Sequence, residues 1–428
     1  MKILVSSFAL LVLAGPSAAA PVEFRPEQIP EVLSLAWCLE RARAANPALE
    51  RASAISEAAA QRVVPAGALD DPRLAYEASN LPLGDLGFRR TPLSGHQFGF
   101  RQTVPFPGLL SNRRSAAQRN AEASALLVED QASATDGAVE IAWSELGFAQ
   151  QALEITGRNI VLLRQLAATA ESRYRVGIGL QQDVLRAQVE LTALLQERFR
   201  RQEAIEVAEA RLAELLDLPA GIDLPHTGPL RLEAAIPRLE PLLAALEERS
   251  ARLKAAGKRV EAAASRVRVA KLEGRPEFDL GIGYRARERV AGDPTGGDGF
   301  LSAGLTIRLP VNRSKWRARL AESEALLRRA RAELRAERAG LASRTLRAHA
   351  ELERASSEAT LLETGLVPQA AQSLESSRSA YEVGRIGFLG LLDSQVRLLE
   401  AELRLARARA DKRAAFASLE AAAGERLR

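Results

Sequence analysis

The sequence predicts a mainly helical chain with a small β part, built by internal duplication. Three observations predict this fold class: a short signature occurs twice, long segments lack proline, and short segments alternate apolar with polar residues. The signature begins with YRVG at Tyr174 and with YEVG at Tyr381, and the two copies stay in register as far as Leu212 and Leu419. Each copy lies between two long helical segments, so we interpret each as the turn of a long helical hairpin.

The first 20 residues have the form of a secretory signal peptide. Lys2 gives a positive start, residues 3–14 are apolar, and Ala18 to Ala20 supply the small residues of a cleavage site. The apolar stretch is shorter than the roughly 20 residues that span a bilayer. We therefore expect cleavage after Ala20 and export of the mature chain; an uncleaved membrane anchor is the alternative.

The composition favours long helices with solvated faces. Aromatic residues make up 4% of the chain, charged residues 26%, and the net charge is +5. Arginines alternate with glutamates along helix faces, as in residues 328–338, so the charge is not gathered as a nucleic-acid site would require. No nucleic acid is expected as a partner. Cys38 is the only cysteine, which excludes an intrachain disulfide and predicts a small buried residue.

Proline marks where long helices can run. Residues 108–218 contain none, and only Pro368 interrupts residues 311–428. A helix over 111–174 would be about 95 Å long at 1.5 Å per residue. Helices of this length need neighbours along their whole length, which predicts a coiled-coil bundle. Pro368 is expected to break the second long helix.

These signals divide the chain into four parts. They are a signal peptide at 1–20, a first structural repeat at 21–217, an inter-repeat linker at 218–241 and a second repeat at 242–428. The linker is dense in proline and glycine. Each repeat is expected to contain a helix, two strands and a long helical hairpin.

Two strand-like segments precede each long hairpin. Apolar residues alternate with polar or small ones around 74–78, 98–104, 278–284 and 301–309. Such segments match strands with one face toward lipid, but a soluble β layer gives the same alternation, and the strands alone leave both open. If the strands enter a membrane, four per chain cannot close a barrel, and open strand edges do not persist in lipid. Several copies of the chain would then each contribute four strands.

The duplicated signature resembles that of the TolC-type outer-membrane efflux family. The opening segment 35–47 and the closing segment 411–424 are also similar to this family. Asp71-Pro72-Arg73-Leu74, followed by Asn80-Leu81-Pro82, resembles more specifically the cobalt–zinc–cadmium efflux branch. The resemblance implies a homotrimer in the cell outer membrane that extends into the periplasm. In it, four transmembrane β-strands per chain close as a 12-stranded barrel, and the helices form a long α-helical coiled-coil tunnel.

The resemblance also implies the function and the partners. A periplasmic adaptor (membrane fusion) protein docks on the tunnel tip, and an inner-membrane transporter of the RND type supplies the energy. The chain would be the outer-membrane channel of this tripartite efflux system, exporting metal cations or small toxic solutes. Two alternatives are a conduit for type I protein secretion and, in a different class, a periplasmic coiled-coil scaffold.

No enzymatic activity, cofactor or metal site is expected. The sequence contains no catalytic constellation, and the tunnel of the family performs no chemistry. His96, His226 and His349 are far apart in the sequence and show no metal-ligand spacing.

The resemblance assigns two sets of residues to the tip. The adaptor-docking residues are Tyr174, Val176, Gly177, Val383 and Gly384. The tunnel-entrance gate is expected at Asp393, Asp183 and Tyr381. The two glycines let the chain turn tightly.

The gate residues follow from their places in the motif. Asp183 matches a family residue that hydrogen-bonds the tyrosine at Tyr381 in the closed state. Three Asp393 side chains around a threefold axis would attract cations. Gly390 stands where a further carboxylate is found in family members, so any cation preference should be weaker here. For Asp183 and Asp393, the alternative is a solvated residue near a helix turn.

Overall fold

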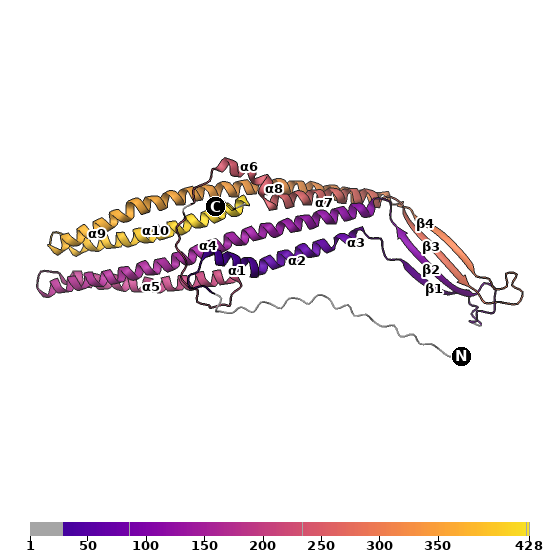
Figure 1. Ribbon diagram of the computed structural model, residues 1–428, viewed down its shortest axis with the longest axis horizontal. Coiled ribbons are helices and arrows are strands. Elements are labelled where there is room, and N and C mark those ends of the chain that lie inside the picture. The colour runs from indigo at the N-terminus through magenta and orange to yellow at the C-terminus, as the bar shows by residue number, and fades with distance from the viewer. Residues whose placement is uncertain (1–28, 85, 233, 425, 428) are drawn as a thin grey trace.

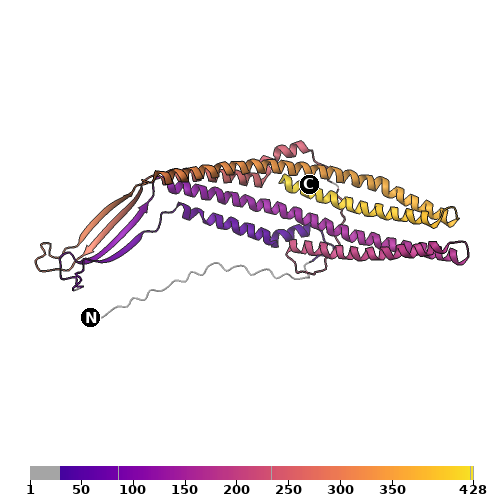
Figure 2. The ribbon, with the colours of Figure 1, turned by 180° about the vertical axis from the view of Figure 1, so that it is seen from behind.

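The computed structural model describes residues 29–84, 86–232, 234–424 and 426–427. The molecule is a long rod with four strands at one end and two helical turns at the other (Figures 1 and 2). Long helices with a four-stranded antiparallel sheet confirm the predicted fold class. The predicted signal peptide at 1–20 lies outside the described residues.

Helices form most of the rod. The longest, α4, spans Leu109–Arg175, which confirms the long helix predicted over 111–174. Its 67 residues correspond to about 100 Å at 1.5 Å per residue. The other helices are α1 (Leu35–Ala45), α2 (Pro47–Gln61), α3 (Val63–Gly67), α5 (Gln181–Leu216), α6 (Leu239–Arg249), α7 (Ala251–Glu273), α8 (Arg313–Leu361), α9 (Val367–Glu382) and α10 (Phe388–Ala423).

Side-chain caps fix where three of the shorter helices begin. Ser34, Asn46 and Ser250 precede α1, α2 and α7, and each side-chain oxygen accepts a hydrogen bond from a backbone N–H of the first turn. Pro47 lies in the first turn of α2, where its missing N–H has no intrahelical partner to lose. The matching helices α2 and α7 therefore begin with the same type of cap.

Pro368 does not break the second long helix, contrary to the prediction. The helical path continues from α8 through a π-helical turn, η2 (Leu362–Leu366), into α9. Proline has no N–H to donate and its ring clashes with the preceding turn. A local widening to i→i+5 bonding accommodates both effects without ending the helix.

The sheet joins the two halves of the chain. Its strands are β1 (Arg73–Ser79), β2 (Gly95–Val104), β3 (Glu277–Ala286) and β4 (Phe300–Arg308), in the order β1-β2-β3-β4. All neighbours are antiparallel. Because β2 pairs with β3, strands that are far apart in the sequence form the centre of one sheet (Figure 1).

The core follows the helix interfaces and consists mainly of alanine and leucine. Helix α4 lies at its centre and packs against α2, α5, α7 and α10. Cys38 is fully buried, as predicted, and burial raises the pKa of its thiol to about 12. Trp143 is buried nearby and donates its indole N–H to the carbonyl oxygen of Leu33 at 2.7 Å.

The stretch between α5 and α6 runs across the middle of the rod and is tied to several helices. Its Thr227 forms an isolated parallel bridge with Leu33, and the Thr227 N–H donates to the side chain of Gln150 on α4 at 2.9 Å. Farther along, the carbonyl oxygen of Pro237 lies 2.8 Å from Nε2 of His349 on α8. These contacts fix the connection between the two halves against both long hairpins.

Candidate functional site: the helical tip and the sheet

The two signature copies form two tight turns at the helical tip (Figure 1). Gly177 and Gly384 have φ of +77° and +75°, a left-handed conformation that glycine adopts without steric cost. After each glycine, an N–H reaches back five residues: Ile178 donates to the carbonyl of Arg173 at 3.0 Å, and Arg385 to that of Ala380 at 2.8 Å. This bonding satisfies the last carbonyls of α4 and α9 in the same way.

The two signature tyrosines have different environments despite the matching turns. Tyr381 is 4% exposed, whereas Tyr174 is 44% exposed. The Tyr381 ring packs edge-on against the fully buried Phe388, with ring centroids 5.8 Å apart. The second turn therefore has its own small core, and the first turn presents its tyrosine to solvent.

Arg173 links the two turns. Its Nη1 donates to the carbonyl oxygens of Tyr381, at 2.5 Å, and of Glu382, at 3.2 Å. Its guanidinium also lies over the Tyr381 ring, 4.7 Å from the centroid. A cation at the carbonyl end of α9 is favourable for the helix dipole. The sequence analysis missed this residue, although one signal was available: the signature tyrosine follows Arg173 in the first copy and Ala380 in the second.

The three predicted gate residues lie on three different helices. Tyr381 is near the end of α9, Asp183 in the first turn of α5, and Asp393 in α10. Burial raises the pKa of Tyr381; Arg173 acts to lower it and Asp183 to raise it. The structure thus brings Asp183 near Tyr381 electrostatically, without a hydrogen bond between these two described residues.

Asp393 is exposed and already has a partner. Its carboxylate accepts a hydrogen bond from Nε of Arg397, one helical turn farther along, at 2.8 Å. The Asp393 side chain is 58% exposed, so water screens this pair strongly. Its assignment to a gate stays a prediction.

The predicted docking residues surround the turns and are mostly accessible. Val176 and Val383 occupy matching cap positions and are both exposed. Ile178 and Leu180, which the sequence analysis did not single out, are exposed beside them on the first turn. The first turn thus presents a more continuous apolar surface than the second. The docking role stays a prediction.

One face of the sheet has a group of ten large apolar side chains that are exposed. The strand register places them in rows across the sheet, such as Tyr76, Phe98, Tyr284 and Leu301. The exposed apolar residues on this face are Leu74, Tyr76, Phe98, Phe100, Leu280, Ile282, Tyr284, Leu301, Leu305 and Ile307. A contiguous apolar surface of this kind marks contact with a membrane or with another protein.

The opposite face has mostly polar or small residues, and Phe300, the register partner of Arg285, is a large apolar exception. Thr103 donates its hydroxyl to Asp279 at 2.6 Å, and Arg285 donates to the side-chain oxygen of Gln97 at 2.8 Å. Arg308 pairs with Glu277. The sheet therefore has one apolar and one mainly polar face, which matches the alternation found in the sequence.

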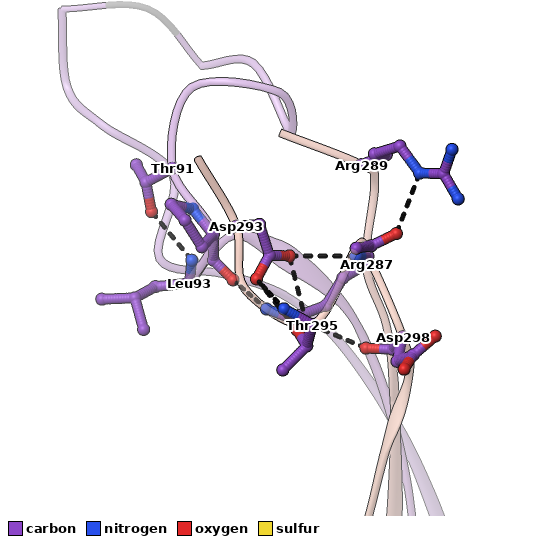
Figure 3. A network of polar contacts seen from close by, with 10 residues as sticks. Thr91, Leu93, Arg287, Arg289, Asp293, Thr295 and Asp298 are labelled. Carbon is purple, nitrogen blue, oxygen red and sulfur yellow. Dashed lines mark hydrogen bonds and ion pairs between the residues drawn. The ribbon is translucent and has the colours of Figure 1, made fainter. Parts of the chain in front are cut away.

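Beyond the sheet, the loop between β3 and β4 has an ordered interior (Figure 3). The side chains of Arg287 and Asp293 are only 5% and 2% exposed and lie 3.4 Å apart. Arg287 also donates to the carbonyl oxygen of Pro92 in the β1–β2 loop at 2.7 Å, which ties the two loops together. Hydrogen bonding from the Thr295 backbone N–H lowers the pKa of Asp293, with smaller contributions from its hydroxyl and from Gly297.

Among the described residues, no group of three or more His, Cys, Asp or Glu side chains is placed to hold a metal ion. No helix in the described part of the chain combines the length and the apolar character needed to cross a membrane.

Comparison with known proteins gives a family match for the second half of the chain and a shared fold for nearly all of it. Residues 242–425 match the family model described as outer membrane efflux protein. No curated protein sequence matches the chain significantly. Among solved structures, the outer-membrane channel OprN is 20% identical, with 92% of this chain and 90% of that chain covered and a TM-score of 0.79. The outer membrane protein VceC from Vibrio cholerae is also 20% identical, with 92% and 97% covered and a TM-score of 0.77.

CusC, whose structures describe transmembrane channel formation, is 17% identical, with 92% of both chains covered and a TM-score of 0.77. At these identities, the likeness to solved structures shows a shared fold over nearly the whole described chain. The family match covers somewhat less than half of the chain, all of it in the second half. The chain therefore has the fold of these outer-membrane channels, and its second half is similar to the outer membrane efflux protein family.

Proposed function

We propose that three copies of this chain form the outer-membrane conduit of a tripartite efflux system. The observation that supports assembly most directly is that the sheet has two unpaired edges and an exposed apolar face. Its outer strands, β1 and β4, each pair on one side only, while its apolar face is exposed. Open strand edges are not tolerated in lipid, so neighbouring copies must supply the missing pairs. Three copies of a four-stranded sheet give one closed sheet of twelve strands.

The helices support the same assembly. Helix α5 packs mainly on α4, and α8 packs on α7 and α10, so both have surface left for a neighbour. Both helices expose large apolar residues: Leu185, Val189, Phe199 and Val207 on α5, and Leu326, Leu346 and Leu361 on α8. In the trimer these surfaces would face the adjacent copies and close the tunnel wall.

The tip is the proposed docking end. Tyr174, Val176 and Gly177 of the first turn, with Val383 and Gly384 of the second, would contact a periplasmic adaptor that connects to an inner-membrane transporter. Asp183, Tyr381 and Asp393 would line the tunnel entrance. The accessibility of both valines and the positions of Asp183 and Tyr381 support this assignment.

The cargo would be metal cations or small toxic solutes. The cobalt–zinc–cadmium branch rests on the Asp71-Pro72-Arg73-Leu74 motif and the Asn80-Leu81-Pro82 segment that follows it. CusC, at 17% identity, is no more similar to this chain than OprN at 20%. Any choice between metals would lie with the inner-membrane transporter.

Two neighbouring residues of β4 provide the test. Leu305 is on the apolar face, and Thr306 is on the polar face. Arginine on a lipid-facing position near the bilayer midplane costs about 2–4 kcal/mol. Leu305→Arg should therefore lower the amount of protein extracted from the outer membrane as a three-chain particle, and Thr306→Arg should not. Equal effects of the two changes, or a wild-type particle of one chain, would contradict the proposal.

A further inference from the structure

Two arginines on the polar face of the sheet form no ion pair with any described residue. Arg73 of β1 and Arg101 of β2 are register partners, so their Cβ atoms lie about 5 Å apart on one face. Neither guanidinium forms an ion pair or hydrogen bond with another described residue. Like charges directly opposite each other destabilise a strand pair. This arginine pair therefore has an energetic cost that an anion would offset.

The nearby acidic residues do not neutralise the pair. Asp279 accepts the hydroxyl of Thr103 and lies 3.9 Å from Arg308, which also pairs with Glu277. Glu77 is four residues along β1 from Arg73, a separation of about 13 Å along a strand. Asp70 and Asp71 precede Arg73 in the chain, and neither carboxylate forms an ion pair with the two arginines. The two guanidiniums are therefore without an ion-pair partner among the described residues.

Beside the arginine pair is open space. A groove of about 360 Å³ is lined by both arginines and by Gly99, Gly281, Gly283 and Gly304. A Cβ built at Gly281 would have its nearest neighbours at 3.8 Å, and one at Gly304 would meet nothing within 4 Å. Close packing therefore does not require glycine at these two positions, although glycine weakens a strand interior. Their effect is to leave room next to the guanidiniums.

We propose that the arginine pair is an anion-binding site that gives the conduit a preference for small anions and for anionic groups of its cargo. This inference rests on the proposed function, in which the polar face lines the lumen. Arg73 is the first residue of β1, so the site lies at the end of the sheet nearest the helices. In the trimer, the pair would recur three times and place its guanidiniums at one level. A ring of one charge sign raises the local concentration of counterions.

The test is the ion selectivity of the purified full-length channel in a planar lipid bilayer. The reversal potential across a potassium chloride gradient gives the permeability ratio of chloride to potassium. The variant is Arg73→Gln combined with Arg101→Gln, and the matched control is Arg51→Gln on α2, which removes an exposed arginine away from the sheet.

The expected result is a lower ratio in the double variant alone. If the double variant lowers the local electrostatic energy of a unit positive charge by about half a kT, the chloride-to-potassium permeability ratio falls about threefold. The local chloride concentration falls and the local potassium concentration rises, and the two changes multiply in the ratio. The difference should shrink at about 1 M salt, where the Debye length is about 3 Å. Gly281→Glu, which places a carboxylate beside Arg101, should lower the ratio in the same way.

The outcomes separate the two proposals. If the wild type and the double variant conduct with the same ratio, the arginine pair is not a selectivity site, and the channel proposal stands. If the wild-type protein forms no conducting pore, the proposed function fails and this inference fails with it. A heat-stable oligomer of wild-type size confirms that each variant has folded before its ratio is compared.

Discussion

Arg173→Gln tests whether one side chain holds together the two hairpin turns at the tip, which follow α4 and α9. In the wild type, Nη1 of Arg173 donates to the carbonyl oxygens of Tyr381 and Glu382, and the guanidinium lies over the Tyr381 ring. Glutamine keeps a polar side chain but removes the charge and the planar donor group. The change therefore removes the link without altering the turn sequence itself.

The size of the effect follows from these contacts. A hydrogen bond from a charged group contributes a net of about 1.5–3 kcal/mol. A cation–π contact at an exposed site adds about 0.5–1 kcal/mol. Arg173 is partly exposed, so we take a value of about 2 kcal/mol for the whole contact. This corresponds to a change of about 30-fold in the equilibrium for local opening of the second turn.

Hydrogen exchange at the second turn measures this opening. The N–H of Gly384 donates to the carbonyl of Tyr381, and that of Arg385 to Ala380, so both amides report on whether the turn is closed. We expect both to exchange about 30-fold faster in Arg173→Gln. Arg175→Gln is the matched control, because Arg175 is an exposed arginine of the same turn. Equal exchange in the two variants would refute the assigned role of Arg173.

Two further predictions concern the second turn and the loops beyond the sheet. Phe388→Ala empties a fully buried site beside Tyr381 and should destabilise the second hairpin by about 3–5 kcal/mol, measured by chemical unfolding. The control is Leu389→Ala, which changes an exposed neighbour and should leave the free energy of unfolding almost unchanged. Asp293→Asn should make the β3–β4 loop more sensitive to proteolysis at neutral pH. Because the folded pKa of Asp293 is lowered, its contribution is present above the unfolded pKa and is lost as pH falls through the folded value, so wild type and variant should converge in strong acid.

The long helices and the strands could be predicted because their signals are local. The absence of proline over 108–218 and the apolar spacing within that stretch depend only on neighbouring residues, and α4 matches them. Alternation over 301–309 likewise anticipated β4 and its two faces. Pro368 was misjudged because a single proline can be absorbed by a π-helical turn when neighbouring helices hold both sides in place.

The contacts that define the candidate sites were not predictable in the same way. Arg73 and Arg101 become neighbours only through the β1–β2 register, and the glycines that leave room beside them come from three strands. Arg173 meets the carbonyls of Tyr381 and Glu382 across more than 200 positions of sequence. Such contacts depend on how distant segments of the chain pair with each other. The periodicity of a single segment does not specify that pairing.

The two duplicated turns differ at one position, Arg173 in the first copy and Ala380 in the second, and this difference bears on how the tip opens. Both turns have the same backbone bonding, so either could in principle donate an arginine to the other. Within one chain, Arg173 of the first turn reaches the carbonyls of the second. In the proposed trimer, the second turn would also face the first turn of the next copy. There the second turn has Ala380 at the position that matches Arg173, and Ala380 offers no side-chain donor. The contact inside each chain would therefore be stronger at this position than its counterpart between chains. An opening of the tip should accordingly begin between chains, with each chain's two hairpins held together by Arg173.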